Sequence, residues 1–364
     1  MKKSIVIALS TGFASSLALA DSVKSIDQPK KESLDTVLVI GQALDEPVTV
    51  IVDPKAPRQP LPAHDGADYL KTIPGFSVTR KGGTDGDAVF RGMAGSRLGI
   101  LVDGENIHGG CNSRMDAPTA YIYPEIYDSL VIVKGPQSVQ HGAGNTAGTI
   151  LFERNIERFS ELGYRLHASV TGASFSRFDE VADLQVGNST AYLQLNGTDS
   201  RSDDYEYGDG NSVHSEYHRY SGLAALGWTP NDDSKVEFSI ARSDGEAAYA
   251  DRSMDGTKFL RDSLNFRAER KNINDYINEI KFHVYDNSVD HIMDDQELRK
   301  PGMMGYANLK RETNGGKLSS KLLFGPSVDL AVGIDAQQNT HESRSASVNG
   351  NYSAWADDAD IEQL

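Results

Sequence analysis

Apolar and polar residues alternate along many segments from residue 163 onward, and this pattern restricts the possible folds more than any other feature. From Tyr164 to Thr171, the even-numbered residues are apolar or aromatic and the odd-numbered ones are polar or charged. A period of two places these two sets on opposite faces of a β-strand. The same period recurs at residues 182–186, 191–195, 224–228, 236–240, 264–268, 280–284, 318–324 and 328–334. This part of the chain therefore predicts about nine strands, each with one apolar and one polar face.

The connections between these segments also alternate, in length. Short turns are expected at residues 187–190, 229–234, 270–274 and 325–327, and long polar loops at 199–216, 246–260 and 294–310. Short turns on one side of a sheet and long loops on the other are typical of outer-membrane β-barrels. A soluble β-sandwich is the alternative, but its polar face meets solvent and its loop lengths need not alternate. We therefore expect an antiparallel transmembrane β-barrel.

Residues 48–158 have a different, glycine-rich pattern. One helical and three strand-like segments are expected there, at residues 67–73, 89–92, 100–104 and 130–136. The last of these is apolar throughout, so we expect it to be buried on both faces. These residues predict a compact α+β domain ahead of the strands of residues 159–364. Barrels of about 22 strands hold a plugged lumen, and the α+β domain is a candidate plug.

The first 20 residues resemble a secretory signal peptide. Met1, Lys2 and Lys3 form a short basic segment, an apolar run extends from Ile5 to Leu19, and residues 18–20 fit an A-x-A cleavage site. A membrane anchor is the alternative, but the run is shorter than the roughly 18 to 20 apolar residues that span a bilayer. We predict that residues 1–20 direct export and are then removed.

Residues 21–47 are expected to form a flexible segment, since they begin with a polar, aperiodic stretch. Within them, residues 35–40 are abruptly β-branched and apolar. This short segment fits either the first strand of the next domain or a donor strand that adds to the sheet edge of a partner protein.

Charge and motifs exclude two classes of function. The formal net charge is −16, which makes nucleic acid an unsuitable partner. The sequence contains no G-x-S-x-G elbow, no P-loop and no H-E-x-x-H motif. We therefore expect that the chain is not an enzyme.

The order of several motifs resembles that of TonB-dependent outer-membrane receptors. The matching plug signatures lie at residues 67–70, 73–76, 91–93, 100–104, 131–138 and 142–150. His141 departs from the pattern, in which a tyrosine is usual. The resemblance implies an α+β plug domain followed by an antiparallel transmembrane β-barrel, in the outer membrane of a Gram-negative cell envelope.

The resemblance also implies that the protein has a partner, TonB, and that the chain is a fragment of a longer receptor. Its TonB box would consist of Asp35, Thr36, Val37, Leu38 and Val39, which would pair with TonB and its inner-membrane energising complex. We expect a monomer embedded in outer-membrane lipid. About nine of roughly 22 strands are predicted, and residues 360–364 lack a terminal aromatic strand, so we expect that the chain is truncated within the barrel.

Cys111 is the only cysteine, and Met115 follows it by four residues. One helical turn, or a loop, would place both sulfur atoms on the same side. An unpaired thiol in an oxidising compartment is open to oxidation unless it is buried or bound to a ligand. Burial in apolar surroundings is the commoner fate, so this pair alone does not predict a metal site.

A second pair, His291 and Met293, strengthens the metal interpretation. Residues two apart share one face of a strand. The even positions 280–284 form the apolar face, so the odd positions, carried forward to His291 and Met293, should face the barrel lumen. A β-bulge between Val284 and His291 would reverse this expectation. If the chain leaves the plug on the periplasmic side, this strand runs outward and the pair lies at its outer end.

Together the two pairs offer a thiolate, an imidazole and two thioethers. This soft ligand set suits Cu(I) and is poorly suited to iron, calcium or magnesium. The combination Cys-x-x-x-Met and His-x-Met, with the flank at residues 111–125, resembles the TonB-dependent copper receptors. We therefore expect Cys111, Met115, His291 and Met293 to bind copper, as Cu(I), as the imported ion. His108 is expected to be exposed; the alternative is a group that supports the site without binding the metal.

Two alternatives remain open. A ferric siderophore or cobalamin receptor would bind its bulky ligand with aromatic side chains such as Tyr205, Tyr207, Tyr217 and Tyr220, and Cys111 would be only structural. An attachment protein, such as a phage or bacteriocin receptor, would not need the TonB box at all.

Overall fold

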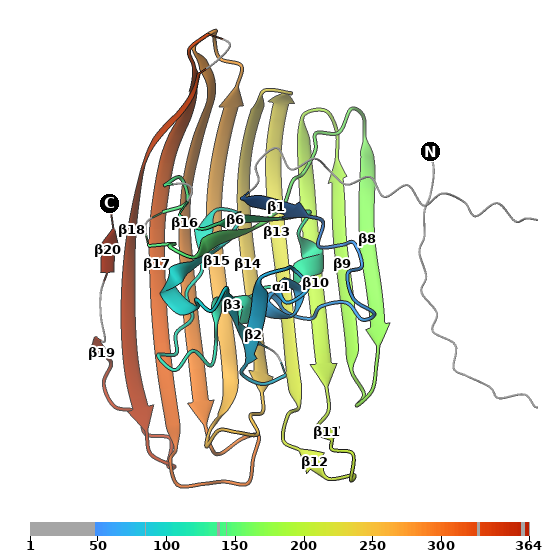
Figure 1. Ribbon diagram of the computed structural model, residues 1–364, viewed down its shortest axis with the longest axis vertical. Coiled ribbons are helices and arrows are strands. Elements are labelled where there is room, and N and C mark those ends of the chain that lie inside the picture. Colours follow the sequence, from blue (N-terminus) through green and yellow to red (C-terminus); the bar gives the residue numbers. More distant parts are fainter. Residues whose placement is uncertain are drawn as a thin grey trace, which may run out of the picture. The chain divides into compact units, whose positions relative to one another are not determined.

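The computed structural model describes residues 48–83, 85–136, 139–142, 144–325, 328–357 and 361–363. The predicted signal peptide, the flexible segment and the TonB box at residues 35–39 therefore lie outside the described residues. Within the described ranges, a small mixed region is followed by a sheet of long strands (Figure 1).

The small region holds a mixed sheet, one α-helical turn and three 3-10 turns. In chain order its elements are β1 (Thr49–Val52), α1 (Gly66–Leu70), β2 (Phe76–Arg80), β3 (Gly86–Phe90), η1 (Gly95–Arg97), β4 (Leu98–Val102), β5 (Glu105–Asn106), η2 (Pro118–Tyr121), η3 (Pro124–Ile126), β6 (Ser129–Lys134) and β7 (Gly148–Glu153). The strand order is β1-β6-β7-β4-β5, with β4 and β7 parallel, and β2 pairs with β3 as a hairpin. This is the α+β arrangement that the sequence predicts.

Local sequence explains where these elements begin and end. The Asp65 side chain accepts a hydrogen bond of 2.7 Å from the Asp68 N–H and so caps the start of α1. Gly75 follows the helix with φ +97°, and a Cβ there would lie 2.8 Å from the Phe90 ring, so only glycine fits this turn.

The expectation that the apolar run at residues 130–136 is buried on both faces is wrong. In β6, Leu130 and Ile132 are buried, whereas Val131 and Val133 are only partly covered. The strand lies between β1 and β7, and only one of its faces packs into the hydrophobic core. An apolar run alone does not reveal how many faces are covered.

The long strands form an antiparallel sheet in which sequence neighbours pair. They are β8 (Gly163–Gly172), β9 (Phe178–Gly187), β10 (Ala191–Ser202), β13 (Tyr217–Asn231), β14 (Ser234–Ala247), β15 (Asp255–Lys271), β16 (Ile277–Asp294), β17 (Tyr306–Leu323) and β18 (Asp329–Ala346). Two short strands, β19 (Ala356–Asp357) and β20 (Ile361–Gln363), pair with β18 and complete an 11-stranded sheet. A small hairpin of β11 (Tyr205–Glu206) and β12 (Ser212–Val213) lies in the loop after β10.

The two faces of this sheet have opposite polarity, as the alternation predicts. The apolar face is exposed, with Leu166 at 61 %, Leu226 at 62 % and Ile334 at 60 % of full exposure. On the other face, polar side chains such as Gln194 and Asn287 are buried. A soluble sandwich would bury the apolar face, so this sheet has the polarity of a barrel wall in lipid. The predicted fold class is thereby confirmed.

No helix within the described ranges is long and apolar enough to cross a membrane.

Buried charges join the small region to the long sheet. Arg154, which follows β7, forms ion pairs with Asp103 at 2.5 Å and with Glu237 of β14 at 3.2 Å. Glu105 of β5 likewise accepts hydrogen bonds from Arg261 at 3.0 Å and from other polar groups of β15 and β16.

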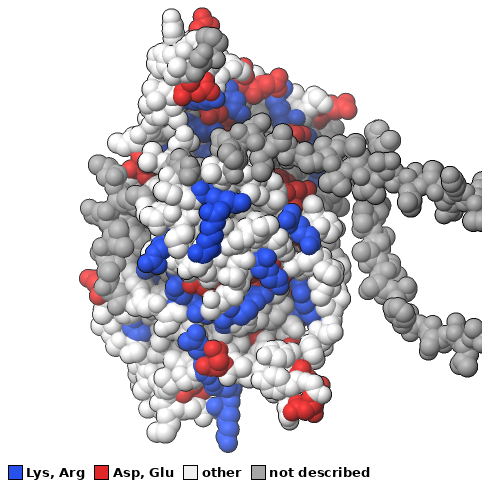
Figure 2. All heavy atoms as spheres, viewed as in Figure 1, with Lys and Arg blue, Asp and Glu red and all other residues white. Residues whose placement is uncertain are grey.

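On the face of the molecule seen in Figure 2, Lys and Arg are spread across the centre, while Asp and Glu lie mainly toward the ends.

The Arg154 network generates a stability prediction. Arg154→Gln removes one of the cations that Asp103 and Glu237 share. It should lower the free energy of unfolding by about 3 kcal/mol, because the negative charges of the two buried carboxylates are then no longer fully neutralised. Arg242→Gln is the control, since the Arg242–Asp262 pair is at least half exposed on both sides; it should cost about 1 kcal/mol or less. Denaturation followed by circular dichroism measures both. Equal losses in the two variants would contradict the network's role.

Candidate metal centre

The loop between β5 and η2 carries Cys111 and is held by the carboxylate of Asp116. The Cys111 N–H donates to Asp116 Oδ1 at 2.8 Å, and the Gly110 N–H donates to Oδ2 at 2.6 Å. The Arg114 N–H donates to the Cys111 carbonyl at 2.8 Å, and Arg114 has φ +54°. A non-glycine residue in the left-handed region ends a turn and does not continue a helix. Cys111 and Met115 are therefore brought together by a loop.

Two glycines before Cys111 make the close packing of this loop possible. A Cβ on Gly109 would lie 2.0 Å from the carbonyl oxygen of Asp116. A Cβ on Gly110 would lie 3.3 Å from the Leu309 carbonyl oxygen of β17 and 3.5 Å from Cβ of His291. The loop thus lies directly against the long sheet at this point.

His291 faces this loop from β16, as strand parity predicts. From Lys281 to Ile292, β16 pairs with β15 and β17 without a register shift, so no bulge separates Val284 from His291. His283, Asn287 and His291 are buried, whereas Val284 on the opposite face is exposed. The expectation that the odd positions of this strand point inward is confirmed.

The tautomer of His291 is fixed by a single hydrogen bond. Its Nδ1 lies 2.8 Å from the carbonyl oxygen of Lys258, and since a carbonyl only accepts, Nδ1 must donate. Nε2 then carries a free lone pair. This nitrogen is buried and has no hydrogen-bond partner among the described residues. A metal-binding histidine is held in this way, with one ring nitrogen donating to the protein and the other left for the metal.

A β-bulge supplies the carbonyl that binds His291. The register between β15 and β16 shifts between Gly256 and Lys258, which leaves Thr257 as an extra residue. Bulges often turn a group toward an adjacent site. Phe259, the residue of β15 that pairs with His291, packs against the imidazole with ring centroids 4.6 Å apart.

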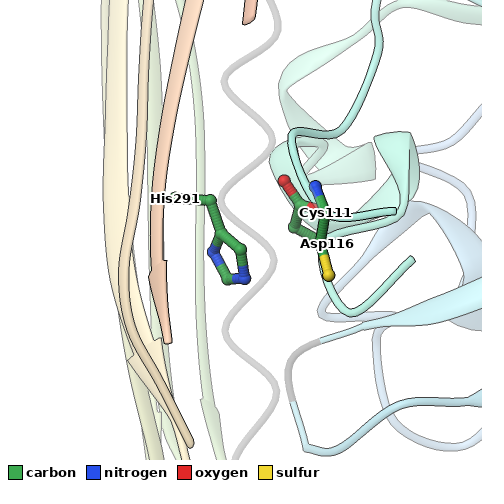
Figure 3. Close-up of side chains that lie close together, drawn as sticks. All are labelled: Cys111, Asp116 and His291. Atoms are coloured by element: carbon green, nitrogen blue, oxygen red, sulfur yellow. The ribbon is translucent and has the colours of Figure 1, made fainter. Parts of the chain in front are cut away.

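The ligand atoms of Cys111, Asp116 and His291 all lie within 4.8 Å of one another, and all three residues are buried (Figure 3). In Figure 3 the imidazole extends from the sheet toward the loop that holds the other two. Met293 adds a second sulfur, since Cys111 Sγ lies 3.7 Å from Met293 Sδ. Two sulfur ligands of one tetrahedral metal, each bound at about 2.3 Å, lie about 3.8 Å apart.

Met115, the fourth predicted ligand, is buried in the same hydrophobic cluster as Cys111, and Met293 packs against that cluster. The Met115 carbonyl accepts a hydrogen bond of 2.8 Å from the Tyr249 hydroxyl. Cys111, His291 and Met293 thus lie close together where the small region meets the long sheet, and Met115 packs in the same extended hydrophobic cluster. Their role as metal ligands stays a prediction.

Sequence reasoning missed two residues of this site. Asp116 follows Met115 directly, and aspartate side chains in loops often accept hydrogen bonds from nearby backbone N–H groups, a signal that could have found it. His341 of β18 donates from Nε2 to the Gly110 carbonyl oxygen at 2.7 Å. This contact joins a strand and a loop that are far apart in the sequence, so no local sequence pattern indicates the role of His341.

Burial dominates the electrostatics of the loop. It raises the pKa of the Cys111 thiol, and the Asp116 carboxylate adds to this, although backbone N–H groups of residues 113–115 oppose it. Burial, with the cations Arg311 and Arg114, lowers the pKa of His108 to about 4. His108 is only partly exposed and lies 3.3 Å from Gln337, so the expectation of an exposed histidine is wrong.

The chain is similar to proteins described as receptors or transporters of metals and cofactors. Residues 42–149 match the family described as TonB-dependent Receptor Plug Domain. The solved structure of the copper transporter OprC shares 45 % identity with a TM-score of 0.83, over 88 % of this chain and 52 % of that one. The ferric citrate transporter FecA, at 14 % identity and a TM-score of 0.65, shows likeness of fold alone.

Curated relatives are more distant. The hemin receptor of Yersinia pestis is 28 % identical over 198 residues, which is 48 % of this chain and 29 % of the receptor. The vitamin B12 transporter BtuB of Vibrio vulnificus is 23 % identical over 361 residues, 92 % of this chain and 55 % of the transporter. The chain spans about half or less of the length of these proteins.

The packing of the Gly-Gly turn generates a prediction on thiol reactivity. Cys111 is 6 % exposed and is the only cysteine, so a bulky thiol reagent should label the protein slowly and at one site. Gly109→Ala should speed labelling about tenfold or more, because the new Cβ forces the loop away from Asp116 and opens it locally. Gly172→Ala, where a Cβ meets nothing within 4 Å, is the control and should not change the rate. Unchanged labelling of both variants would refute the packing argument.

Proposed function

We propose that this chain, a TonB-dependent receptor with a plug domain and a sheet of long antiparallel strands, takes copper as its transported substrate. The observation that carries the proposal is the buried imidazole of His291, whose Nε2 has no hydrogen-bond partner among the described residues and which has a ring nitrogen within 4.8 Å of Cys111 Sγ. The receptor is a transporter and not an enzyme, and its family resides in the outer membrane.

The chemistry of the donors favours Cu(I). Cys111 and Met293 contribute sulfur, His291 contributes a neutral imidazole nitrogen, and Met115 offers a further thioether. Soft sulfur ligands select Cu(I) over iron, calcium or magnesium. The 45 % identity to the copper transporter OprC supports the same substrate.

The division of the ligands between two parts of the chain suggests how copper is released. Cys111 and Met115 belong to the plug, whereas His291 and Met293 belong to β16. In our proposal, TonB binds Asp35–Val39 and, driven by its inner-membrane complex, pulls on the plug. Any shift of the plug separates the two pairs of ligands, so the force that opens the path also dismantles the site. The signal peptide at residues 1–20 and a monomeric state belong to the same proposal.

A bulkier cargo such as a siderophore or cobalamin is the second candidate. Tyr205 and Tyr207 are exposed and lie with ring centroids 6.2 Å apart, a surface on which an aromatic chelate can stack. Tyr217, in contrast, is buried and cannot serve in this way without rearrangement.

Copper titration of the purified protein under anaerobic conditions tests the proposal. We expect about one Cu(I) per chain, and Cys111→Ala should weaken binding more than about 100-fold, beyond the effect of losing an outer-shell group. Met303→Leu, a change at a methionine that is 94 % exposed, is the control and should bind normally. Undiminished loading of Cys111→Ala would exclude the assigned site. Growth rescue by one iron siderophore would favour the second candidate.

The raised pKa of Cys111 predicts a pH dependence of copper affinity. Below that pKa the free protein holds a protonated thiol, so copper must displace a proton. Affinity should therefore rise about tenfold per pH unit through the neutral range and fall on acidification. Competition with a Cu(I) chelator at a series of pH values measures this slope. The slope should be shallower in Cys111→Ala, and an affinity independent of pH would contradict thiolate binding.

A further inference from the structure

Asp116 is completely buried, and both of its carboxylate oxygens already accept hydrogen bonds. Oδ1 accepts from the Cys111 N–H at 2.8 Å, and Oδ2 accepts from the Gly110 N–H at 2.6 Å and from the Tyr121 hydroxyl at 2.8 Å. Hydrogen bonds to a buried carboxylate are among the strongest in proteins, because they compensate for the loss of hydration. The main chain on both sides of the Gly110–Cys111 peptide bond is thus bound to one side chain.

The sheet holds the same stretch from the other side. His341 of β18 donates to the Gly110 carbonyl at 2.7 Å, while Asp116 binds the Gly110 and Cys111 N–H groups. The peptide group that leads into Cys111 therefore has its oxygen fixed by the sheet and its N–H fixed by the plug. This arrangement restricts where the cysteine side chain can point.

We propose that Asp116 is a positioning residue of the copper site, which fixes the Cys111 main chain so that the thiol sulfur faces His291 and Met293. This inference rests on the proposed copper function. Asp116 lies close enough to be a ligand. However, a carboxylate offers about four lone-pair directions, and the hydrogen bonds above use most of them. Carboxylate oxygen is also a hard donor that suits Cu(I) poorly.

Positioning groups of this kind set metal affinity without touching the metal. A ligand that is already held in place loses little conformational freedom when the metal binds. Asn cannot replace Asp116 in this role, because its amide nitrogen donates and cannot accept from an N–H or from the Tyr121 hydroxyl. Asp116→Asn should therefore release at least part of the loop.

A double-mutant cycle in the purified protein separates positioning from direct binding. Cu(I) affinity is measured by anaerobic competition with a chelator for Asp116→Asn, Cys111→Ala and the combined variant. We expect Asp116→Asn alone to weaken affinity about 10- to 100-fold, and to have no further effect once Cys111 is absent. The labelling rate of Cys111 should also rise in Asp116→Asn. Additive losses in the cycle would show that Asp116 binds copper itself and would overturn the inference.

A matched control and a milder variant guard against loss of folding. Asp204 likewise accepts from two backbone N–H groups, those of Ser215 at 2.7 Å and Glu216 at 2.9 Å, but lies in the loop after β10. Asp204→Asn should keep normal copper affinity, and an equal loss there would overturn the inference. If Asp116→Asn does not fold, Tyr121→Phe takes its place in the cycle, because it removes one hydrogen-bond donor to Oδ2. We expect Tyr121→Phe to weaken Cu(I) affinity less than Asp116→Asn, and only when Cys111 is present.

The outcomes distinguish this inference from the proposed function. If the unaltered protein does not bind Cu(I), the copper proposal fails and the inference falls with it. If the unaltered protein and Asp116→Asn bind Cu(I) equally well, only the positioning role of Asp116 is overturned.

Discussion

The structure depends on the inverted polarity of the long sheet. Its apolar side chains are exposed, and its polar side chains are buried against the plug. Polar groups enclosed between plug and sheet are therefore stabilised by hydrogen bonds, ion pairs or ligands, and leaving one unpaired costs free energy. Arg154 and Glu105 show how such groups are paired across this interface. His291 Nε2 is one of several buried polar atoms without a hydrogen-bond partner among the described residues, and its imidazole belongs to the cluster with Cys111 and Asp116.

The candidate site combines rigid support from the sheet with a tightly bound loop from the plug. On the sheet side, a bulge in β15 presents the Lys258 carbonyl, which fixes the tautomer of His291. On the plug side, Asp116 holds the loop, and Gly109 allows the close approach that this requires. Neither half is a site alone. A soft metal ion bound between them, as we propose, would give the imidazole nitrogen of His291 a partner and would bind both sulfur atoms.

Much of this arrangement follows from the sequence because strand parity is strict. The two-residue period located the strands, and an unbroken register in β16 carried the inward direction to His291 and Met293. Parity fails to predict what depends on loops and on contacts between distant strands. Asp116 and His341 were missed for this reason. The prediction that both faces of β6 are buried is wrong, because an apolar sequence does not reveal whether one face of a strand is covered or both. Residues 35–39 lie outside the described part of the chain.

X-ray absorption spectroscopy at the copper edge tests the central claim most directly. For the purified protein loaded with Cu(I), we expect sulfur scatterers at about 2.3 Å together with an imidazole nitrogen at about 2.0 Å, by analogy with other thiolate and histidine sites. The imidazole signal should disappear in His291→Ala and persist in Met303→Leu. A spectrum with only oxygen or nitrogen neighbours, or an imidazole signal unchanged in His291→Ala, would contradict a copper site shared by plug and sheet.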